Sequence, residues 1–351
     1  MRLGSLFTAS ALGIGNEETL KNYIARNAPG MRQIEGDIPD RKIWFGSVPF
    51  EGDKSIIRTN QLLKLAFNNL SRPFGKLVGK YGPSRVAIIL GASNTGIDEA
   101  ENLVDRWLDE GEKPEELDFS MIELGTPALY LQSLVGSTGP AWTVSTACSS
   151  ASKAFAAAKR IIECGIVDAA IVGGVDGRCR FAMNGFHALG ALSEGRCRPL
   201  AEDRDGINLG EGVALWTMEK DCGEIELLSV GESSDAYHAT APDPEGFGAE
   251  SAMREALRLG GKVPEDVDYL NLHGTGTIAN DAMEMKAVRR LFGERMPEFE
   301  STKALTGHCL GAAGAVEAAI CHLRLTHGLS RCALSNSFAF GGSNAAVLLH
   351  A

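Results

Sequence analysis

The chain has 351 residues, 44% of them apolar, which is enough for a large buried core and for two domains or one duplicated domain. Its formal net charge of −11 excludes a general nucleic-acid binder. No stretch approaches the roughly 18 apolar residues of a membrane span, and the N-terminus does not resemble a signal peptide. We therefore expect a cytoplasmic protein with no membrane span and no nucleic acid among its partners.

Short β-branched runs alternate with longer helical stretches along the chain. Strands are expected at 86–90, 169–172, 213–218, 269–272, 331–336 and 345–349. Helices are expected at 60–68, 150–164, 249–259, 282–291 and 313–326. This alternation predicts a layered α/β fold in which helices cover sheets. A weak similarity between the halves, each bringing a reactive residue to a strand end (Cys148 and His273), suggests a duplication.

The eight cysteines are scattered, and their spacing offers neither a Cys-x-x-Cys pair nor a zinc motif. We expect reduced thiols and no metal, with most of these cysteines acting as small buried apolar residues. Cys148 differs, because it follows a strand-like run and immediately precedes a predicted helix. Free N–H groups and the helix dipole there would lower its pKa and favour the thiolate. The alternative is a buried structural cysteine.

Two histidines lie in loops rich in small residues. His273 follows a predicted strand and precedes Gly-Thr-Gly-Thr, in which Thr275 and Thr277 offer hydroxyl groups. His308 follows Lys303 by five residues in a second loop. The alternatives are a structural strand-end histidine and, for Lys303, an ordinary surface lysine.

Two further features complete the pattern. Glu317, on the predicted helix after the second histidine loop, could pair with Lys303. A Phe-Gly-Gly turn, with Phe338, Phe340 and Gly341, exposes N–H groups that could form half of an oxyanion hole, although alone it reads as a hairpin. The sequence has no Walker loop and no dinucleotide fingerprint, so we expect no resident cofactor.

These motifs, in this order, resemble the elongating β-ketoacyl-acyl-carrier-protein synthases of the thiolase superfamily. The matching segments include Thr146–Ser150, Val172–Asp176, Arg198–Gly206, Gly210–Gly212, His273–Thr277, Lys303–Glu317 and Asn336–Asn344. The resemblance implies a thiolase-like duplicated five-layer α-β-α-β-α fold. Its halves would be residues 1–220, with the nucleophile, and 221–351, with both histidines.

The same resemblance implies a role for each residue. Cys148 would carry the acyl chain, and His273 and His308 would bind the malonyl thioester and promote loss of CO2. Lys303 and Glu317 would set the charge around the histidines. The backbone N–H groups of Cys148 and Phe340 would form the oxyanion hole. Substrate-binding roles fall to Thr275 and Thr277, which would bind the phosphopantetheine arm of the carrier, and to Phe338 and Gly341, while Phe340 would also act as a gate.

The implied reaction is decarboxylative Claisen condensation with malonyl-acyl-carrier-protein, in fatty-acid or polyketide (for example aryl-polyene) synthesis. The phosphopantetheine would arrive on the acyl carrier protein. His308 stands where initiating synthases have asparagine, and Cys148 stands where chain-length factors have glutamine. A degradative thiolase and a non-catalytic partner subunit are the other hypotheses. A homodimer across an edge strand is expected, and a heterodimer with a chain-length-factor-like partner remains open.

The chain departs from the family in three places that matter here. Residues 30–75 match poorly, which leaves their structure and the acyl-chain preference open. Asn208 stands where the family is usually apolar, and Ala339 stands where glycine is common. Lys54, Arg58 and Arg198 are the candidate docking cations for an acidic carrier protein, with scattered solvated charges as the alternative.

Overall fold

Ten strands of the computed structural model, which describes residues 1–39, 41–53 and 55–351, run side by side as two blocks of five. The first block has the order β1-β9-β7-β5-β6, with bounds Arg2–Ser10, Gly212–Glu219, Ala169–Asp176, Val86–Gly91 and Ala141–Val144. The second has the order β10-β14-β13-β11-β12, with bounds Ile225–Ser234, Ser343–His350, Cys332–Phe338, Tyr269–Asn271 and Glu298–Glu300. A short antiparallel contact between β1 and β10 joins the blocks.

The two blocks are built alike, which shows that the chain is duplicated. Each begins with two antiparallel pairings (β1–β9–β7 and β10–β14–β13) and continues with two parallel ones (β7–β5–β6 and β13–β11–β12). The helices also correspond. These pairs are α2 (Arg58–Tyr81) with α7 (Phe247–Leu259), α4 (Thr126–Val135) with α8 (Ile278–Phe292), and α5 (Ser150–Glu163) with α10 (Ala313–Thr326).

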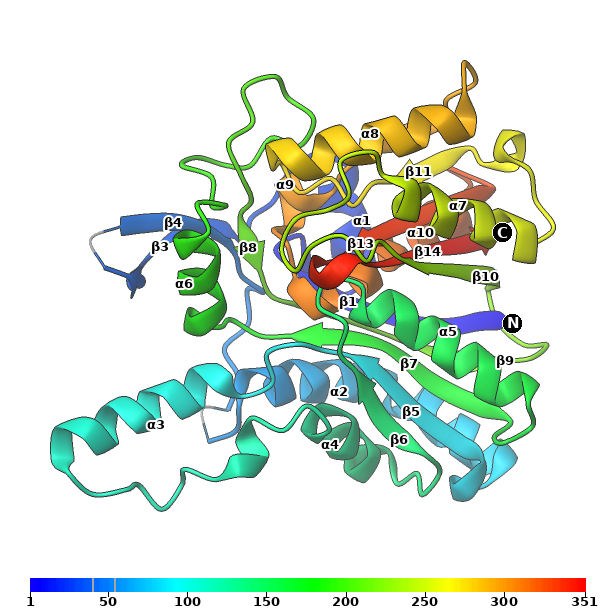
Figure 1. Ribbon diagram of the computed structural model, residues 1–351. Helices are drawn as coiled ribbons and strands as arrows, with labels where there is room; N and C mark the ends of the chain where they lie inside the picture. The colour runs from blue at the N-terminus through cyan, green and yellow to red at the C-terminus, as the bar shows by residue number, and fades with distance from the viewer. Residues whose placement is uncertain (40, 54) are drawn as a thin grey trace.

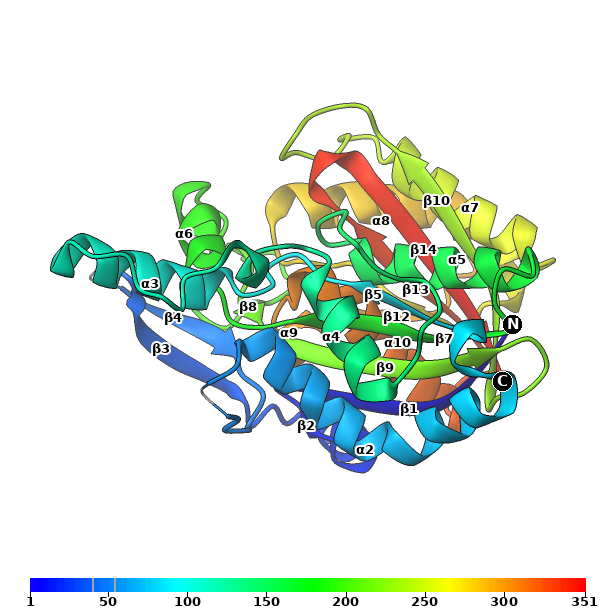
Figure 2. The ribbon, with the colours of Figure 1, turned by 90° about the horizontal axis from the view of Figure 1, so that it is seen from below.

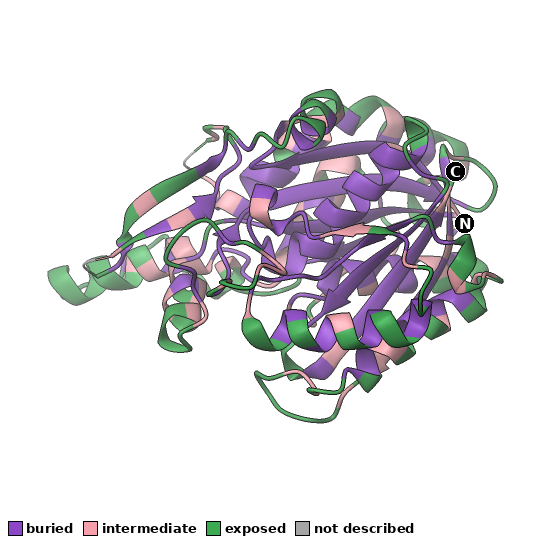
Figure 3. Ribbon diagram, turned by 90° about the horizontal axis from the view of Figure 1, so that it is seen from above, coloured by how far each residue is buried: buried purple, intermediate pink, exposed green. Residues whose placement is uncertain are grey.

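Helices α5 and α10 lie between the two blocks and share one hydrophobic core with both (Figure 1). Thirteen of the fourteen residues of α10 are buried, which explains why it is apolar on all sides. Helices α2 and α4 cover the outer face of the first block, and α7 and α8 cover that of the second (Figures 1 and 2). Figure 3 shows the buried strands beneath outer helices with exposed faces. This confirms the predicted five-layer fold.

The duplication corrects one prediction about the reactive residues. Cys148 lies between β6 and α5, and the matching segment of the second block, between β12 and α10, contains Lys303 and His308. His273 follows β11, so its counterpart is the loop after β5, at residues 92–96. The equivalence drawn between Cys148 and His273 from the sequence was therefore wrong.

In the poorly matching range 30–75, the described residues include two paired strands and most of a long helix. Strands β3 (Met31–Ile38) and β4 (Arg41–Gly46) pair with the short β8 (Leu209–Gly210) in a separate sheet. Helix α2 continues through Pro73 to Tyr81, well beyond the expected 60–68. The first strand carries the short β2 (Gly13–Ile14) at its end, followed by α1 (Asn16–Ile24).

Between β5 and β6 the chain forms a protruding segment that begins with α3 (Ile97–Glu110) and continues through η2 (Phe119–Met121) to α4. Helix α3 extends away from the body of the molecule (Figures 1 and 2). Helix α6 (Arg180–Ala188) lies near its base. The remaining short elements are η1 (Pro83–Arg85), η3 (Pro264–Asp266), α9 (Lys303–Thr306), η4 (Leu310–Ala312) and η5 (Phe340–Gly342).

Candidate active site

Cys148 lies on a tight turn between the end of β6 and the start of α5. The residue before it, Ala147, has a φ of 52°, a left-handed conformation that is uncommon for a residue with a side chain. Hydroxyl groups hold this turn: Ser150 Oγ accepts from Thr146 N at 2.9 Å and donates to Ala147 O at 2.6 Å. Ser149 Oγ donates to Thr146 O at 2.9 Å. The turn thus fixes the thiol, which is 6% exposed, at the N-terminal end of α5.

Both predicted histidines reach Cys148 from the second block. His308 Nε2 lies 3.0 Å from Cys148 Sγ, and the rings of His273 and His308 stand edge to face with centroids 5.3 Å apart. The sulfur and one nitrogen of each ring all lie within 4.8 Å of one another. Three residues that are 125 and 35 positions apart in sequence therefore form one cluster.

The two imidazoles are held neutral. Burial lowers the pKa of both His273 and His308 well below the usual value, and the nearby ammonium group of Lys303 lowers both further. A neutral ring with one N–H can donate a hydrogen bond to a developing oxyanion without carrying a charge of its own.

Lys303 is a buried residue of this cluster, which excludes the surface-lysine alternative. It is 1% exposed, and its Nζ donates to His273 O at 2.5 Å and lies 3.3 Å from His273 Nδ1. The same ammonium pairs with the carboxylate of Glu317, as the sequence suggested. Burial raises the pKa of Glu317 to about 7, against the opposing effect of Lys303.

Glu284, which no sequence motif singled out, fixes the backbone around His273. Its carboxylate accepts from His273 N at 2.8 Å, Gly274 N at 2.7 Å and Asn336 Nδ2 at 3.1 Å. The side chain is 0% exposed, and burial raises its pKa to about 7. The only sequence signal was an acidic residue on an apolar helix face eleven positions after the histidine.

The expected lowering of the Cys148 pKa is not found. Burial raises the pKa of this thiol to about 11, which outweighs the lowering by Lys303 and by the backbone N–H groups of Phe340 and Cys148. The prediction considered the helix start but not the removal of the thiol from water. The same two N–H groups lie beside the reacting sulfur, where a thioester formed on that sulfur would place its carbonyl oxygen.

A cavity of about 360 Å³ leads to the cluster. Its lining includes both threonines, whose Oγ1 atoms lie 2.9 Å apart, and Phe338 and Phe340. Phe186, from α6, stacks on Phe340 with ring centroids 5.5 Å apart and was not predicted. Gly341 does not line this cavity: with a φ of 78° it shapes the turn, and its N–H donates to Ala239 O at 2.7 Å. Its predicted substrate-binding role stays a prediction.

Of the three docking candidates, Lys54 lies outside the described residues. Arg58 is a half-buried structural residue, because its Nε and NH2 atoms bind both carboxylate oxygens of Glu211, at 3.0 and 2.7 Å. It also donates to Phe50 O at 3.0 Å, so its guanidinium group is already engaged within the protein, which weakens its candidacy as a docking cation. The side chain of Arg198 is 61% exposed and pairs with Asp203 at 2.7 Å.

The Cys148, His273 and His308 atoms are close enough to share a metal ion, but their surroundings oppose it. The ammonium of Lys303, 3.3 Å from His273 Nδ1, would place two cations side by side in a buried site. Two neutral rings beside a thiol are better suited to binding a carbonyl oxygen.

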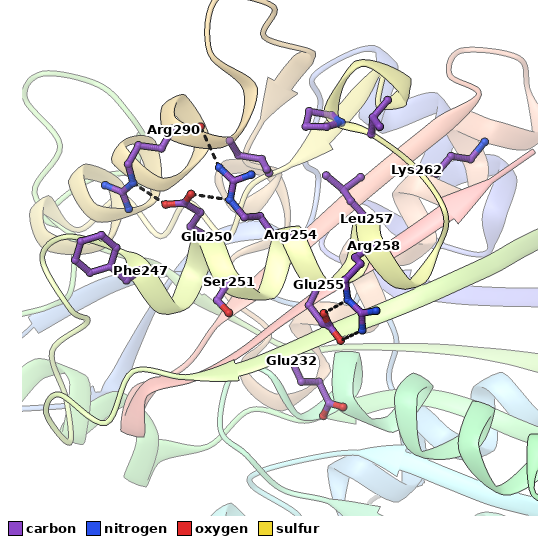
Figure 4. A pocket seen from close by; sticks show the side chains of 13 residues that line it. Glu232, Phe247, Glu250, Ser251, Arg254, Glu255, Leu257, Arg258, Lys262 and Arg290 are labelled. Atoms are coloured by element: carbon purple, nitrogen blue, oxygen red, sulfur yellow. Dashed lines mark hydrogen bonds and ion pairs between the residues drawn. The ribbon is translucent and has the colours of Figure 1, made fainter.

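A larger groove of about 940 Å³ lies over α7 and α8, away from the cluster (Figure 4). Its charges are mostly paired with one another: Glu250 binds Arg254 and Arg290, and Glu255 binds Arg258. The lining residues include neither a cysteine nor a histidine. The smaller cavity is therefore the one that carries the chemistry.

Comparisons with known proteins agree with this geometry. The profile described as "Beta-ketoacyl synthase, N-terminal domain" matches residues 78–221, and the profile for the C-terminal domain matches residues 225–334. Nodulation protein E of Rhizobium meliloti is 32% identical over 331 residues, covering 84% of this chain and 82% of that protein. The 3-oxoacyl-[acyl-carrier-protein] synthase 2 of Staphylococcus aureus is 35% identical over 257 residues, covering 61% of this chain and 64% of that protein.

Among solved structures, a chain from the complex of the ketosynthase ApeO with its chain length factor ApeC, from Xenorhabdus doucetiae, is 38% identical. It superposes with a TM-score of 0.95 over 99% of this chain and 97% of that one. A chain of the ishigamide ketosynthase/chain length factor is 27% identical, with a TM-score of 0.89 and coverage of 99% and 98%. Within the described residues, no helix is both long and apolar enough to span a membrane.

Proposed function

This chain belongs to the β-ketoacyl synthase family, and we propose that it condenses an acyl group held on Cys148 with a malonyl unit delivered by an acyl carrier protein. The observation that carries the proposal is the cluster itself. A thiol lies 3.0 Å from one neutral imidazole, and the second neutral imidazole is held by a buried lysine. The thiol, the two imidazoles and Phe340 thus all line one cavity, and the lysine lies directly behind His273.

Acyl transfer comes first in this proposal. His308 Nε2 takes the thiol proton, the Cys148 sulfur attacks the thioester carbonyl of the acyl carrier, and the carrier thiol leaves with a proton. The raised pKa of Cys148 makes a nearby acceptor necessary, because little thiolate forms unaided. The N–H groups of Cys148 and Phe340 stabilise the tetrahedral oxyanion.

Decarboxylation and condensation follow at the histidines. The malonyl C–C bond to the carboxylate breaks, CO2 leaves, and the electron pair forms an enolate whose oxygen accepts hydrogen bonds from His273 and from His308, whose Nε2 carries the ring proton in this step. The enolate carbon then attacks the acyl carbonyl on Cys148, a C–C bond forms, and the C–S bond breaks. The Cys148 thiolate then takes up a proton from water, because its own proton left with the first carrier thiol, and the β-ketoacyl group remains on the carrier.

Thr275 and Thr277 line the cavity and are our candidates for binding the phosphopantetheine arm. On this proposal the chain needs no resident cofactor, because the prosthetic group arrives on the carrier. We place the reaction in the cytoplasm, in fatty-acid or polyketide synthesis. The eight cysteines, all unpaired, support a reducing compartment.

Cys148→Ala separates the two halves of the reaction and so tests the proposal. We expect this variant to lose acyl loading, measured by intact mass, and condensation, but to keep releasing CO2 from malonyl-carrier protein through the two histidines. His308→Ala should lose CO2 release by about 100-fold, because one oxyanion donor is removed. CO2 release that depends on Cys148 but not on His308 would contradict the assignment.

We also propose that the chain works beside a second chain of the same fold. Strand β6 is the last strand of its block, all four of its residues are half-exposed, and Cys148 follows four residues later. The complexes named above pair a ketosynthase with a chain length factor, and both contain chains that superpose on this one. Native mass spectrometry of the chain, alone and mixed with a chain length factor of the same fold, separates a homodimer from a heterodimer.

A further inference from the structure

We propose that Asn208 is a positioning residue for His308, an inference that rests on the proposed function of the site. Asn208 is 2% exposed, and its backbone carbonyl accepts from His308 N at 2.7 Å. Two residues later, Gly210 N donates to His308 O at 3.0 Å. The backbone of His308 is therefore fixed on both sides by the segment that Asn208 begins.

The side chain of Asn208 ties this segment to a second loop. Its Oδ1 accepts from Cys197 N at 2.6 Å, and its Nδ2 donates to Gly195 O at 2.9 Å. Both amide atoms are thus used, and the apolar residue usual at this position in the family would leave the buried Cys197 N and the part-buried Gly195 O without these partners.

The loop held by Asn208 in turn contacts the lysine of the site. Arg196 donates to Ala304 O at 2.7 Å, and Cys197 Sγ lies 3.5 Å from Lys303 O. The 195–197 loop is therefore bonded both to the Asn208 side chain and to the segment that carries Lys303 and His308. Asn208 touches neither Cys148 nor the cavity, so its effect is exerted through the position of His308 and Lys303.

Asn208→Leu keeps the branched shape of the side chain, with a methyl group in place of each amide atom, and removes its hydrogen bonds to the second loop. Because a displacement of about 1 Å at a reacting group can cost on the order of 100-fold, we expect the rate of CO2 release from malonyl-carrier protein to fall by 10- to 100-fold. The KM for that substrate should change by no more than about threefold, since the cavity lining is intact.

Asn208→Asp adds a readout that a merely structural role would not give. A protonated carboxyl group can accept from Cys197 N and donate to Gly195 O as the amide does, whereas an ionised one has no proton for Gly195 O. The rate of this variant, divided by the wild-type rate at the same pH, should therefore rise as the pH falls.

The matched control is Asn22→Leu. Asn22 is also a buried amide on a backbone carbonyl, donating to Leu12 O at 2.7 Å, but it lies in α1 and contacts none of the site residues. Thermal melting of all variants measures the loss of stability, and turnover is compared at temperatures well below each melting point. We expect the control to lose stability while it keeps its rate.

Alkylation of Cys148 by iodoacetamide gives an answer that does not depend on turnover. With His308 displaced from Sγ, labelling of Cys148 in Asn208→Leu should slow, while labelling of the exposed Cys164 stays unchanged. An unchanged rate of Cys148 labelling in Asn208→Leu would overturn the positioning role. Equal losses of the CO2-release rate in Asn208→Leu and Asn22→Leu would also overturn it. A wild-type chain that labels as expected but releases no CO2 would instead refute the proposed function.

Discussion

At the scale of single residues, two effects determine the pKa values in the site: burial and the charge of Lys303. Cys148, His273, His308, Lys303 and Glu317 are all almost completely removed from water. Burial disfavours the charged form of each, so the thiol keeps its proton and the imidazoles stay neutral. The ammonium of Lys303 favours the thiolate and opposes protonation of the histidines. One lysine therefore sets two properties that the reaction needs.

This balance predicts the effect of Lys303→Met on thiol reactivity. Because the ammonium lowers the pKa of Cys148, its loss should raise that pKa and slow alkylation at a given pH below it. A rise of one pKa unit corresponds to about tenfold slower labelling. Site-resolved mass spectrometry between pH 7 and 10 measures this, with Cys164 as the internal reference. Faster labelling of Cys148 in the variant would refute the role given to Lys303.

At the scale of elements, the sequence was most informative where periodicity and burial coincide. Helix α10 occupies the predicted range 313–326, because its small apolar residues face neighbours on every side. The hairpin β3–β4 and helices α3 and α6 were not predicted, since exposed and charged residues interrupt their patterns. Motifs predicted that Cys148, His273, His308 and Lys303 lie together, whereas Glu284 and Phe186 could be assigned only from contacts with segments distant in the sequence.

Arg58 gives a prediction at this scale, because it ties the start of α2 to the segment between β8 and β9. Removing one partner of a buried ion pair costs about 3–5 kcal/mol, so Arg58→Met should markedly lower the melting temperature. Arg58→Met with Glu211→Leu should recover part of that loss. The KM for carrier-bound substrate, measured on folded enzyme, should stay near the wild-type value. A raised KM with unchanged stability would instead restore Arg58 as a docking residue.

At the scale of the whole molecule, the duplication explains why the site lies where it does. The segment with Cys148 and the segment with Lys303 and His308 occupy matching positions, each before a central helix, α5 or α10. These two helices pack together, so the two copies bring their loops to one place. Duplication of the fold thus creates a two-sided site from segments that have since acquired different chemistry.

The negative charge of the molecule is concentrated in one segment, residues 97–124. Residues 97–124 contain eleven acidic and two basic side chains, which is −9 of the total charge of −11. The same segment exposes Trp107 (41%), Leu108 (77%) and Phe119 (69%). An amphipathic helix with an exposed apolar face is typical of an interaction surface, and its acidic residues favour a basic partner. A second copy of this chain also has a net charge of −11, so its overall charge would repel this acidic segment.

This surface predicts how partner binding responds to substitution and salt. Trp107→Ser with Leu108→Ser should weaken assembly with a partner of the same fold, without changing CO2 release from malonyl-carrier protein by the isolated chain. Neutralising Asp109, Glu110 and Glu112 with amides should slow association at low salt and reduce its salt dependence, because the acidic segment attracts the partner before contact. Stopped-flow association rates at several salt concentrations measure this. A wild-type chain that forms a tight homodimer at low salt, with neutralisation leaving its stability unchanged, would show that this charge does not select the partner.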